Sequence, residues 1–376
     1  MALVFAALVT LDCGLRAAQT APSSLQALLV TGSQALQAGD NAAAAQAFRE
    51  ALTQQPNSVE ILNNLAIALA REGKQQDAIT LYERALQLEP ASSRTTRNLA
   101  IAYFRAQQYA HAWPLLHRLS AASGDFQSLD LAGFTLFALD RYRESARYLE
   151  RASHLQPADL PTLDMLGKAY TRAGNYAAVA DVFARIMAVD PNSAAAHVMM
   201  GMADDKMFHD SDALAEYQAA EKVNPRFPGV HSGLGQLYWK QGKLDLAAME
   251  LRKELDIYPT DPVSNCLLGQ ILRKQNRPAE AVPYLKAAAG ANPKYKEAFF
   301  EWGKCELTLE RAAEAVPPLR KAIALDPQYI QAHYALGTAL RKLGSTQEAS
   351  HELRLAEEIQ AAQRRNYTKK LNAASR

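Results

Sequence analysis

Prolines recur along this chain at a fixed interval, and that interval constrains the fold more than any other feature of the sequence. Six of them follow one another at steps of 34 residues: Pro157, Pro191, Pro225, Pro259, Pro293 and Pro327. Pro56 and Pro90 are also 34 residues apart, and the 67 residues from Pro90 to Pro157 leave one repeat a residue short, with Gly124 where its proline would fall. A period of this length indicates a stack of similar supersecondary units.

A common frame appears when each proline is placed at position 32 of its repeat. Position 8 is then always Gly or Ala, namely Gly32, Ala66, Ala100, Gly133, Gly167, Gly201, Gly235, Gly269, Gly303 and Gly337. Position 20 is also small in most repeats, namely Ala44, Ala78, Ala112, Ser145, Val179, Ala213, Ala247, Ala281, Ala315 and Ala349. Position 24 is large and apolar throughout, and position 27 is alanine in seven repeats.

This pattern resembles the tetratricopeptide repeat family, which has small residues at positions 8, 20 and 27 and proline at position 32. The resemblance covers about residues 25–361 and implies an all-α, right-handed superhelical solenoid of helix-turn-helix repeats. The ten expected repeats are 25–58, 59–92, 93–125, 126–159, 160–193, 194–227, 228–261, 262–295, 296–329 and 330–361. Because no Gly/Ser-rich linker interrupts them, we expect one continuous array.

The spacing of the repeat has a physical explanation that does not depend on the family. Positions 4, 7, 8 and 11 lie on one stripe of a first helix. Glycine inside a helix costs about 1 kcal/mol relative to alanine, so its recurrence at position 8 predicts a close approach of the second helix, opposite the alanine at position 20. Glycines at position 15 predict left-handed ends of the first helix. They are Gly39, Gly73, Gly174, Gly242 and Gly344.

Composition argues against several classes of function. The net charge is 41 − 39 = +2, so no global charge recruits nucleic acid or a membrane. The three cysteines, Cys13, Cys266 and Cys305, are too few for a disulfide framework or a four-cysteine zinc site. No nucleotide, metalloprotease or hydrolase motif is present. We therefore expect no catalysis, cofactor, metal or small-molecule substrate, and a glycan-modifying enzyme would need a catalytic domain that this sequence lacks.

Three histidines, His197, His231 and His333, look at first like a ligand set. All three occupy position 4 of their repeats, where the family has a large side chain. We therefore predict that they are structural.

The two ends of the chain lie outside the repeats. Residues 1–21 contain a short apolar run followed by small residues, which resembles a signal peptide but lacks a basic start. The alternative is a helix that caps the first repeat. Export would place the protein in the periplasm or outside the cell, and a retained N-terminus would leave it in the cytoplasm. Residues 362–376 are basic, and we interpret them as a solvated tail, with an electrostatic contact as the alternative.

Acidic residues interrupt the pattern in two repeats. Asp204 occupies position 11 of repeat six, where a large apolar residue belongs, and Asp205 follows it. Glu254 replaces the usual alanine at position 27 of repeat seven. We expect hairpins that splay slightly toward solvent at these points, and a functional site is the alternative.

The first helices should also carry the binding surface, because the resemblance implies that positions 2, 5, 9 and 12 line a concave groove. The family's carboxylate clamp is not matched: its best register gives Leu29, Ser33, Asn64, Arg94 and Asn98. Position 13 is basic in seven repeats, as Arg71, Arg105, Arg172, Lys206, Lys240, Lys274 and Lys342. These cations either offset helix dipoles, which we favour, or form a ladder for an acidic peptide.

A cluster of aromatic and basic residues predicts the centre of binding. Phe104, Phe134 and Phe137 occupy groove positions in repeats three and four. Exposed aromatics beside arginines are typical of an interface centre, although the short third repeat could instead bury these rings. The other candidate peptide-binding residues are Arg94, Arg97, Asn98, Arg105, Lys168 and Trp239.

The sequence thus predicts a non-enzymatic scaffold that binds a protein or peptide segment in the concave groove. The alternative is an accessory subunit of an envelope, secretion or assembly complex that uses its convex face. The identity of the partner and the oligomeric state cannot be derived from the sequence.

Overall fold

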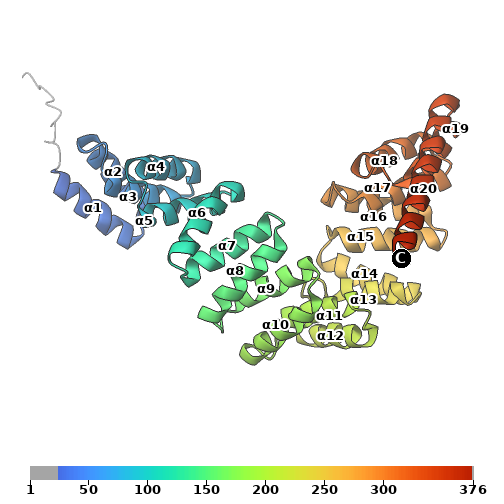
Figure 1. Ribbon diagram of the computed structural model, residues 1–376, viewed down its shortest axis with the longest axis horizontal. Coiled ribbons are helices and arrows are strands. Elements are labelled where there is room, and N and C mark those ends of the chain that lie inside the picture. The colour runs from blue at the N-terminus through green and yellow to red at the C-terminus, as the bar shows by residue number, and fades with distance from the viewer. Residues whose placement is uncertain (1–23, 375–376) are drawn as a thin grey trace, which may run out of the picture. The chain divides into compact units, whose positions relative to one another are not determined.

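The protein is all-α, as the repeat pattern predicts. The computed structural model describes residues 24–374, which form twenty helices and no strand (Figure 1). None of the helices in this range is both long and apolar enough to cross a membrane. The expected signal peptide or cap at residues 1–21 lies outside the described residues.

The chain divides into two compact units, the first ending at Leu155 and the second beginning at Gln156. The helices of unit 1 are α1 Leu25–Ala38, α2 Asn41–Gln54, α3 Val59–Arg71, α4 Gln75–Leu88, α5 Ser93–Arg105, α6 Tyr109–Ala122, α7 Phe126–Ala138 and α8 Tyr142–Leu155. The sequence frame predicts one succession of repeats and carries no information on how tightly one repeat packs on the next. The division into two units is therefore an observation that the sequence analysis did not address.

Unit 2 continues the same succession of helices. They are α9 Leu160–Ala173, α10 Tyr176–Val189, α11 Ala194–Lys206, α12 Asp210–Val223, α13 Val230–Lys240, α14 Leu244–Ile257, α15 Pro262–Lys274, α16 Pro278–Ala291, α17 Lys296–Thr308, α18 Ala312–Leu325, α19 Ile330–Lys342 and α20 Thr346–Ala374. The segment expected to be a separate tail begins inside α20, which runs on as a helix to Ala374.

Within each unit the helices pack as successive hairpins. Each odd-numbered helix packs on the even-numbered helix that follows it, and that helix packs in turn on the next odd-numbered one. In unit 1 the buried side chains from α1 to α7 form one continuous hydrophobic core. A single hairpin could not bury its apolar face alone, so the stack provides the stability.

The glycine at position 8 permits close helix packing, but its main neighbour is not the predicted one. A Cβ added at Gly235 would lie 2.7 Å from Cγ of Leu251, the position-24 side chain. The backbone oxygen of Ala247, at position 20, would be 3.4 Å away. At Gly235 the large side chain at position 24 therefore fills the space over the glycine, and the alanine at position 20 is the second neighbour.

The first helix ends in the left-handed region in every repeat. The predicted glycines have φ between 73° and 83°. The other five repeats adopt positive φ at the same position with Gln107, Asp140, Phe208, Asn276 and Glu310. A left-handed conformation is unfavourable for a bulky residue, and the Phe208 side chain is also 82% exposed. The hairpin geometry therefore prevails over residue preference at this position.

Glu254 is buried rather than splayed toward solvent. Only 2% of it is exposed, and its carboxylate accepts hydrogen bonds from the backbone N–H groups of Gly229 (2.9 Å) and Ser232 (3.1 Å). Most first helices receive this cap from the Ser or Asp that precedes them, but α13 begins after Gly229, which has no side chain. Glu254 supplies the missing cap from α14.

The expectation of a splayed hairpin is also wrong for repeat six. Asp204 is 4% exposed and Asp205 is 9% exposed, so both carboxylates are buried. Asp205 is compensated by Lys240, whose Nζ lies 2.7 Å from its Oδ1. A partner on the next repeat thus allows this acidic residue inside the fold, which the sequence frame does not reveal.

Candidate protein-binding surface

The predicted groove positions of the first helices line three cavities. One lies between repeats two and three of unit 1 and has a volume of about 130 Å³. Two lie in unit 2, over repeats six to eight (about 340 Å³) and over repeats nine and ten (about 450 Å³). In each, residues at positions 9 and 13 of the frame contribute to the wall.

The cavity between repeats two and three has an apolar floor and a basic rim. Ile67 and Ile101, both at position 9, lie beside Tyr82, which is 3% exposed. Burial raises the pKa of the Tyr82 phenol to about 12, an effect that the nearby positive charges of Arg105, Arg94 and Arg71 partly offset. The remaining wall is formed by Ala70, Arg71, Gln75, Asn98, Ala102 and Arg105.

Two arginines whose charges act on Tyr82 have no internal partner, and of these Arg105 lines the cavity whereas Arg94 lies outside its wall. Arg94 and Arg105 are exposed, and neither makes a hydrogen bond or ion pair with any residue that the structure describes. Arg71 differs, because its guanidinium donates a hydrogen bond to the backbone oxygen of Leu36 (3.0 Å). The cavity therefore carries positive charge that is free to meet an acidic group.

Arg97, which the sequence groups with these arginines, has a structural role instead. It forms a bidentate ion pair with Asp125 (3.2 and 3.0 Å) and donates to Gln127 (3.0 Å). Asp125 caps the start of α7 through Ser128. Although burial alone would raise it, the pKa of Asp125 is lowered by hydrogen bonds from Ser123, Ser128 and Arg97. Arg97 thus ties repeat three to repeat four.

The three predicted aromatic rings are half-buried rather than gathered on an exposed patch. Phe104 packs against the core of unit 1 and meets Tyr109 edge-to-face at 5.5 Å between centroids. Phe137 meets Tyr142 in the same way at 5.2 Å. Phe134 is also half-buried. Each of the first two rings therefore has a partner at the start of the second helix of its own repeat.

The two other candidate residues lie in unit 2. Lys168 pairs with Asp164, one turn away on α9 (2.6 Å). Trp239 packs against the core beneath α15, with Nζ of Lys274 over its ring at 5.1 Å and its own indole N–H without a hydrogen-bond partner. Arg94, Asn98 and Arg105 lie in unit 1.

Several basic residues at position 13 link adjacent repeats, a role that neither interpretation of the sequence anticipated. Several reach back to the preceding repeat, as Arg71 does to Leu36. Lys240 reaches Asp205, Lys342 reaches Glu310, and Lys274 covers Trp239. These cations tie adjacent repeats together, whereas Arg105 remains free.

The position-4 histidines are structural, as predicted, and each has a partner that the sequence analysis missed. Nδ1 of His197 lies 2.7 Å from Glu216, that of His231 2.8 Å from Glu250, and that of His333 2.6 Å from Glu352. Every partner lies at position 23, nineteen residues later. The recurrence of His at 4 with Glu at 23 was readable from the sequence.

The cavity over repeats six to eight was not predicted. Its wall includes three carboxylates, those of Asp205, Glu254 and Asp261, together with the rings of Tyr217 and Tyr258. Its acidic groups are already engaged, since Glu254 caps α13, Asp261 caps α15 and Asp205 pairs with Lys240. The charge available to a partner is therefore smaller here than beside Tyr82.

Comparison with models of known protein families shows the family to which the chain belongs. Tetratricopeptide repeat models match residues 15–59, 29–94, 266–330, 210–242 and 330–363. A further model, described as anaphase-promoting complex, cyclosome, subunit 3, matches residues 71–152. The chain belongs to the tetratricopeptide repeat family, whose repeats form protein-interaction scaffolds.

Individual relatives are distant. The chain is 26% identical over 176 residues to Protein FlbA of Caulobacter vibrioides, a match that covers 47% of this chain and 27% of that protein. The chain therefore spans only about a quarter of the length of this curated relative.

Several solved structures are similar to this chain at low sequence identity. MamA from Desulfovibrio magneticus RS-1 is 22% identical, covering 46% of this chain and 98% of its own, with a TM-score of 0.43. YrrB, described as a TPR protein with an unusual peptide-binding site, is 23% identical over 48% of this chain and 92% of its own, with a TM-score of 0.43. Cut9–Hcn1 is 12% identical over 90% and 87%, with a TM-score of 0.47.

Proposed function

We propose that the protein is a non-enzymatic scaffold that binds an acidic segment of another protein in the groove of repeats two and three. The observation that carries the proposal is the pair of unpartnered arginines, Arg94 and Arg105, beside the cavity at Tyr82. Arg94 and Arg105 lie at the two ends of α5, about 16 Å apart along the helix axis, so two acidic groups of one segment would each meet a positive charge that has no internal counter-ion.

The chemistry of the cavity fits such a segment. Ile67 and Ile101 offer an apolar surface for one side chain, and Asn98 and Gln75 add polar side chains at its edge. Interfaces usually draw most of their binding energy from a few residues of this kind, with arginine prominent among them. Charge complementarity would add speed and selectivity to the association.

Charge reversal tests this proposal. The double variant Arg94→Glu/Arg105→Glu should lose at least tenfold in affinity for the partner captured by the wild-type chain from its source cells. Arg49→Glu, an exposed arginine on the second helix α2, is the matched control and should bind normally. Equal binding by the wild type and the double variant would eliminate repeats two and three as the site.

A second candidate function uses the convex face, as in an accessory subunit of an envelope or secretion assembly. Its support is the exposure of apolar side chains at position 30, near the ends of second helices: Leu88 and Leu155 in unit 1, and Val189 and Val223 in unit 2. Isolated exposed apolar residues are common, but recurrence at one position within a unit favours a contact surface on that unit. Replacing Leu88 and Leu155 by serine should abolish capture under this alternative and leave it unchanged under the first proposal. N-terminal sequencing of the mature chain would test the location that the alternative requires.

A further inference from the structure

Repeat six contains a buried carboxylate that the fold does not satisfy. Asp204 is 4% exposed, and its side chain accepts no hydrogen bond from any described residue. Its nearest cationic partner is His209, whose Nδ1 lies 3.6 Å from Oδ1, too far for a hydrogen bond. A buried carboxylate without hydrogen bonds is costly, so this position needs an explanation.

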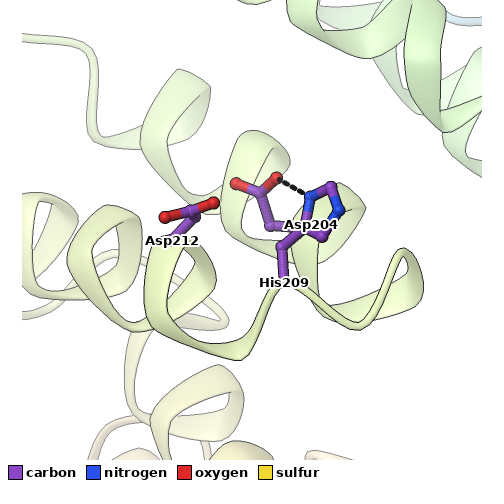
Figure 2. Close-up of side chains that lie close together, drawn as sticks. All are labelled: Asp204, His209 and Asp212. Carbon is purple, nitrogen blue, oxygen red and sulfur yellow. Dashed lines mark ion pairs between the residues drawn. The ribbon is translucent and has the colours of Figure 1, made fainter.

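Three potential ligands converge at this point. One oxygen of Asp204, one oxygen of Asp212 and a ring nitrogen of His209 all lie within 4.8 Å of one another. Figure 2 shows the Asp204 carboxylate between the His209 ring and the Asp212 carboxylate. The three side chains come from the end of α11, the turn after it and the first turn of α12, so a single hairpin holds them together.

Repeat nine has the same arrangement with a different cation. Glu306 also occupies position 11 and is buried, and Arg311 at position 16 lies 3.7 Å from it. Repeats four and eight likewise place arginine at position 16, paired with glutamate at position 19: Arg141 with Glu144 and Arg277 with Glu280. Repeat six has His209 where these repeats have a guanidinium.

Repeat six therefore lacks the permanent cation of these repeats, and its ring nitrogen is a group that can bind a metal ion. Asp205 and Asp210 share the Lys240 ammonium, and Lys206 lies 3.5 Å from Asp205, so neither lysine pairs with Asp204. This lack of a lysine or arginine partner is the deficit of positive charge at the site.

We propose that Asp204, His209 and Asp212 bind one divalent transition-metal ion, of which Zn²⁺ is the best match. Zinc accepts one imidazole nitrogen and carboxylate oxygens at about 2.0–2.2 Å, which places tetrahedral ligands about 3.4 Å apart. The 3.6 Å between Asp204 and His209 is close to that separation. The ion supplies the positive charge that arginine supplies in repeat nine, and three protein ligands leave a fourth position for water or another donor.

A second group of acids and histidine shows the contrast. Glu221, His231 and Glu250 also lie within 4.8 Å of one another. There, however, Nζ of Lys253 is 2.9 Å from Glu250 and 3.7 Å from Glu221, so an ammonium already compensates the carboxylates. Among the groups of this kind in the described residues, the deficit is found in repeat six.

Titration of the full chain with ZnCl₂ tests the proposal. After treatment with a chelator, the wild type should bind one equivalent by calorimetry and melt at a higher temperature with zinc than without it. His209→Ala and Asp212→Ala change exposed side chains and should each weaken the zinc affinity at least tenfold. His351→Ala, an exposed histidine on α20, is the control and should bind as the wild type does.

Two further variants separate a metal site from a simple ion pair. His209→Arg introduces the arginine that repeat nine has at position 16, and this variant should fold without zinc and bind no zinc. Asp204→Leu places an apolar residue at position 11, and this variant should also lose zinc binding. Absence of zinc binding by the wild type would overturn the proposal. Equal zinc binding by the wild type, His209→Ala and Asp212→Ala would overturn it as well.

Discussion

At the scale of single residues, Glu254 departs from the repeat pattern for a reason that only the structure reveals. The frame favours alanine at position 27, so Glu254→Ala is a change toward the family pattern. Because the carboxylate accepts hydrogen bonds from the N–H groups of Gly229 and Ser232 at the start of α13, we predict instead that this variant loses about 2–4 kcal/mol of stability. Denaturant unfolding measures the change, and Glu314→Ala, at an exposed glutamate, is the control. A variant as stable as the wild type would refute this role.

Asp125 gives a prediction about pH at the same scale. Its pKa is lower in the folded chain than its ordinary value, so it contributes stability above that ordinary value and loses the contribution as pH falls through the folded pKa. Asp125→Asn should therefore lower the melting temperature of the protein at pH 7, and the difference from the wild type should shrink toward pH 3. A difference that stays constant over this range would contradict the assignment.

Residue-scale detail was only partly predictable from sequence. The pairing of His at position 4 with Glu at position 23 follows from the 34-residue frame, because both columns can be compared. The burial of Asp204 and Asp205 could not be predicted, because their compensation depends on His209 across a turn and on Lys240 from the next repeat. Phe104 and Phe137 fit neither the exposed nor the fully buried prediction, since each is half-buried and packs edge-to-face on a tyrosine of the second helix.

At the scale of helices, the close packing over position 8 sets the geometry of the hairpin. Gly235→Leu should overpack the contact with Leu251 and cost about 1–3 kcal/mol or more. Gly290→Leu is the matched control, because Gly290 lies in α16 with no atom within 4 Å of an added Cβ. The control should be neutral or slightly stabilising, since glycine is a poor helix former. Equal effects of the two substitutions would show that packing at position 8 is not limiting.

Helix ends were the most predictable elements, because glycine at position 15 marks a left-handed residue. The five repeats without glycine adopt the same conformation, which residue type alone would not have indicated for Phe208 or Glu310. The repeat frame predicts the position of this left-handed residue because it fixes the length of the first helix.

At the scale of the whole molecule, the period predicts the repeats but not their grouping. The boundary between the units along the chain falls between Leu155 and Gln156, where the 34-residue spacing does not change. Repeat arrays are stabilised by contacts between neighbours, so damage should remain local. We predict that Gly235→Leu accelerates amide hydrogen exchange in α13 and α14 and leaves protection of α3 to α6 unchanged. Loss of protection in both units would mean that they unfold as one.

The most direct test of the proposed function is to ask which face the partner contacts. A photo-crosslinking amino acid can replace Ile101, inside the groove cavity of repeats two and three, or Leu88, exposed on the second helix α4. Irradiation of cells that express each variant chain forms a covalent crosslink only where the partner contacts the substituted position. We predict that the partner crosslinks at position 101 and not at position 88, and that Arg94→Glu/Arg105→Glu abolishes the product. Crosslinking at position 88 without crosslinking at position 101 would contradict the groove account.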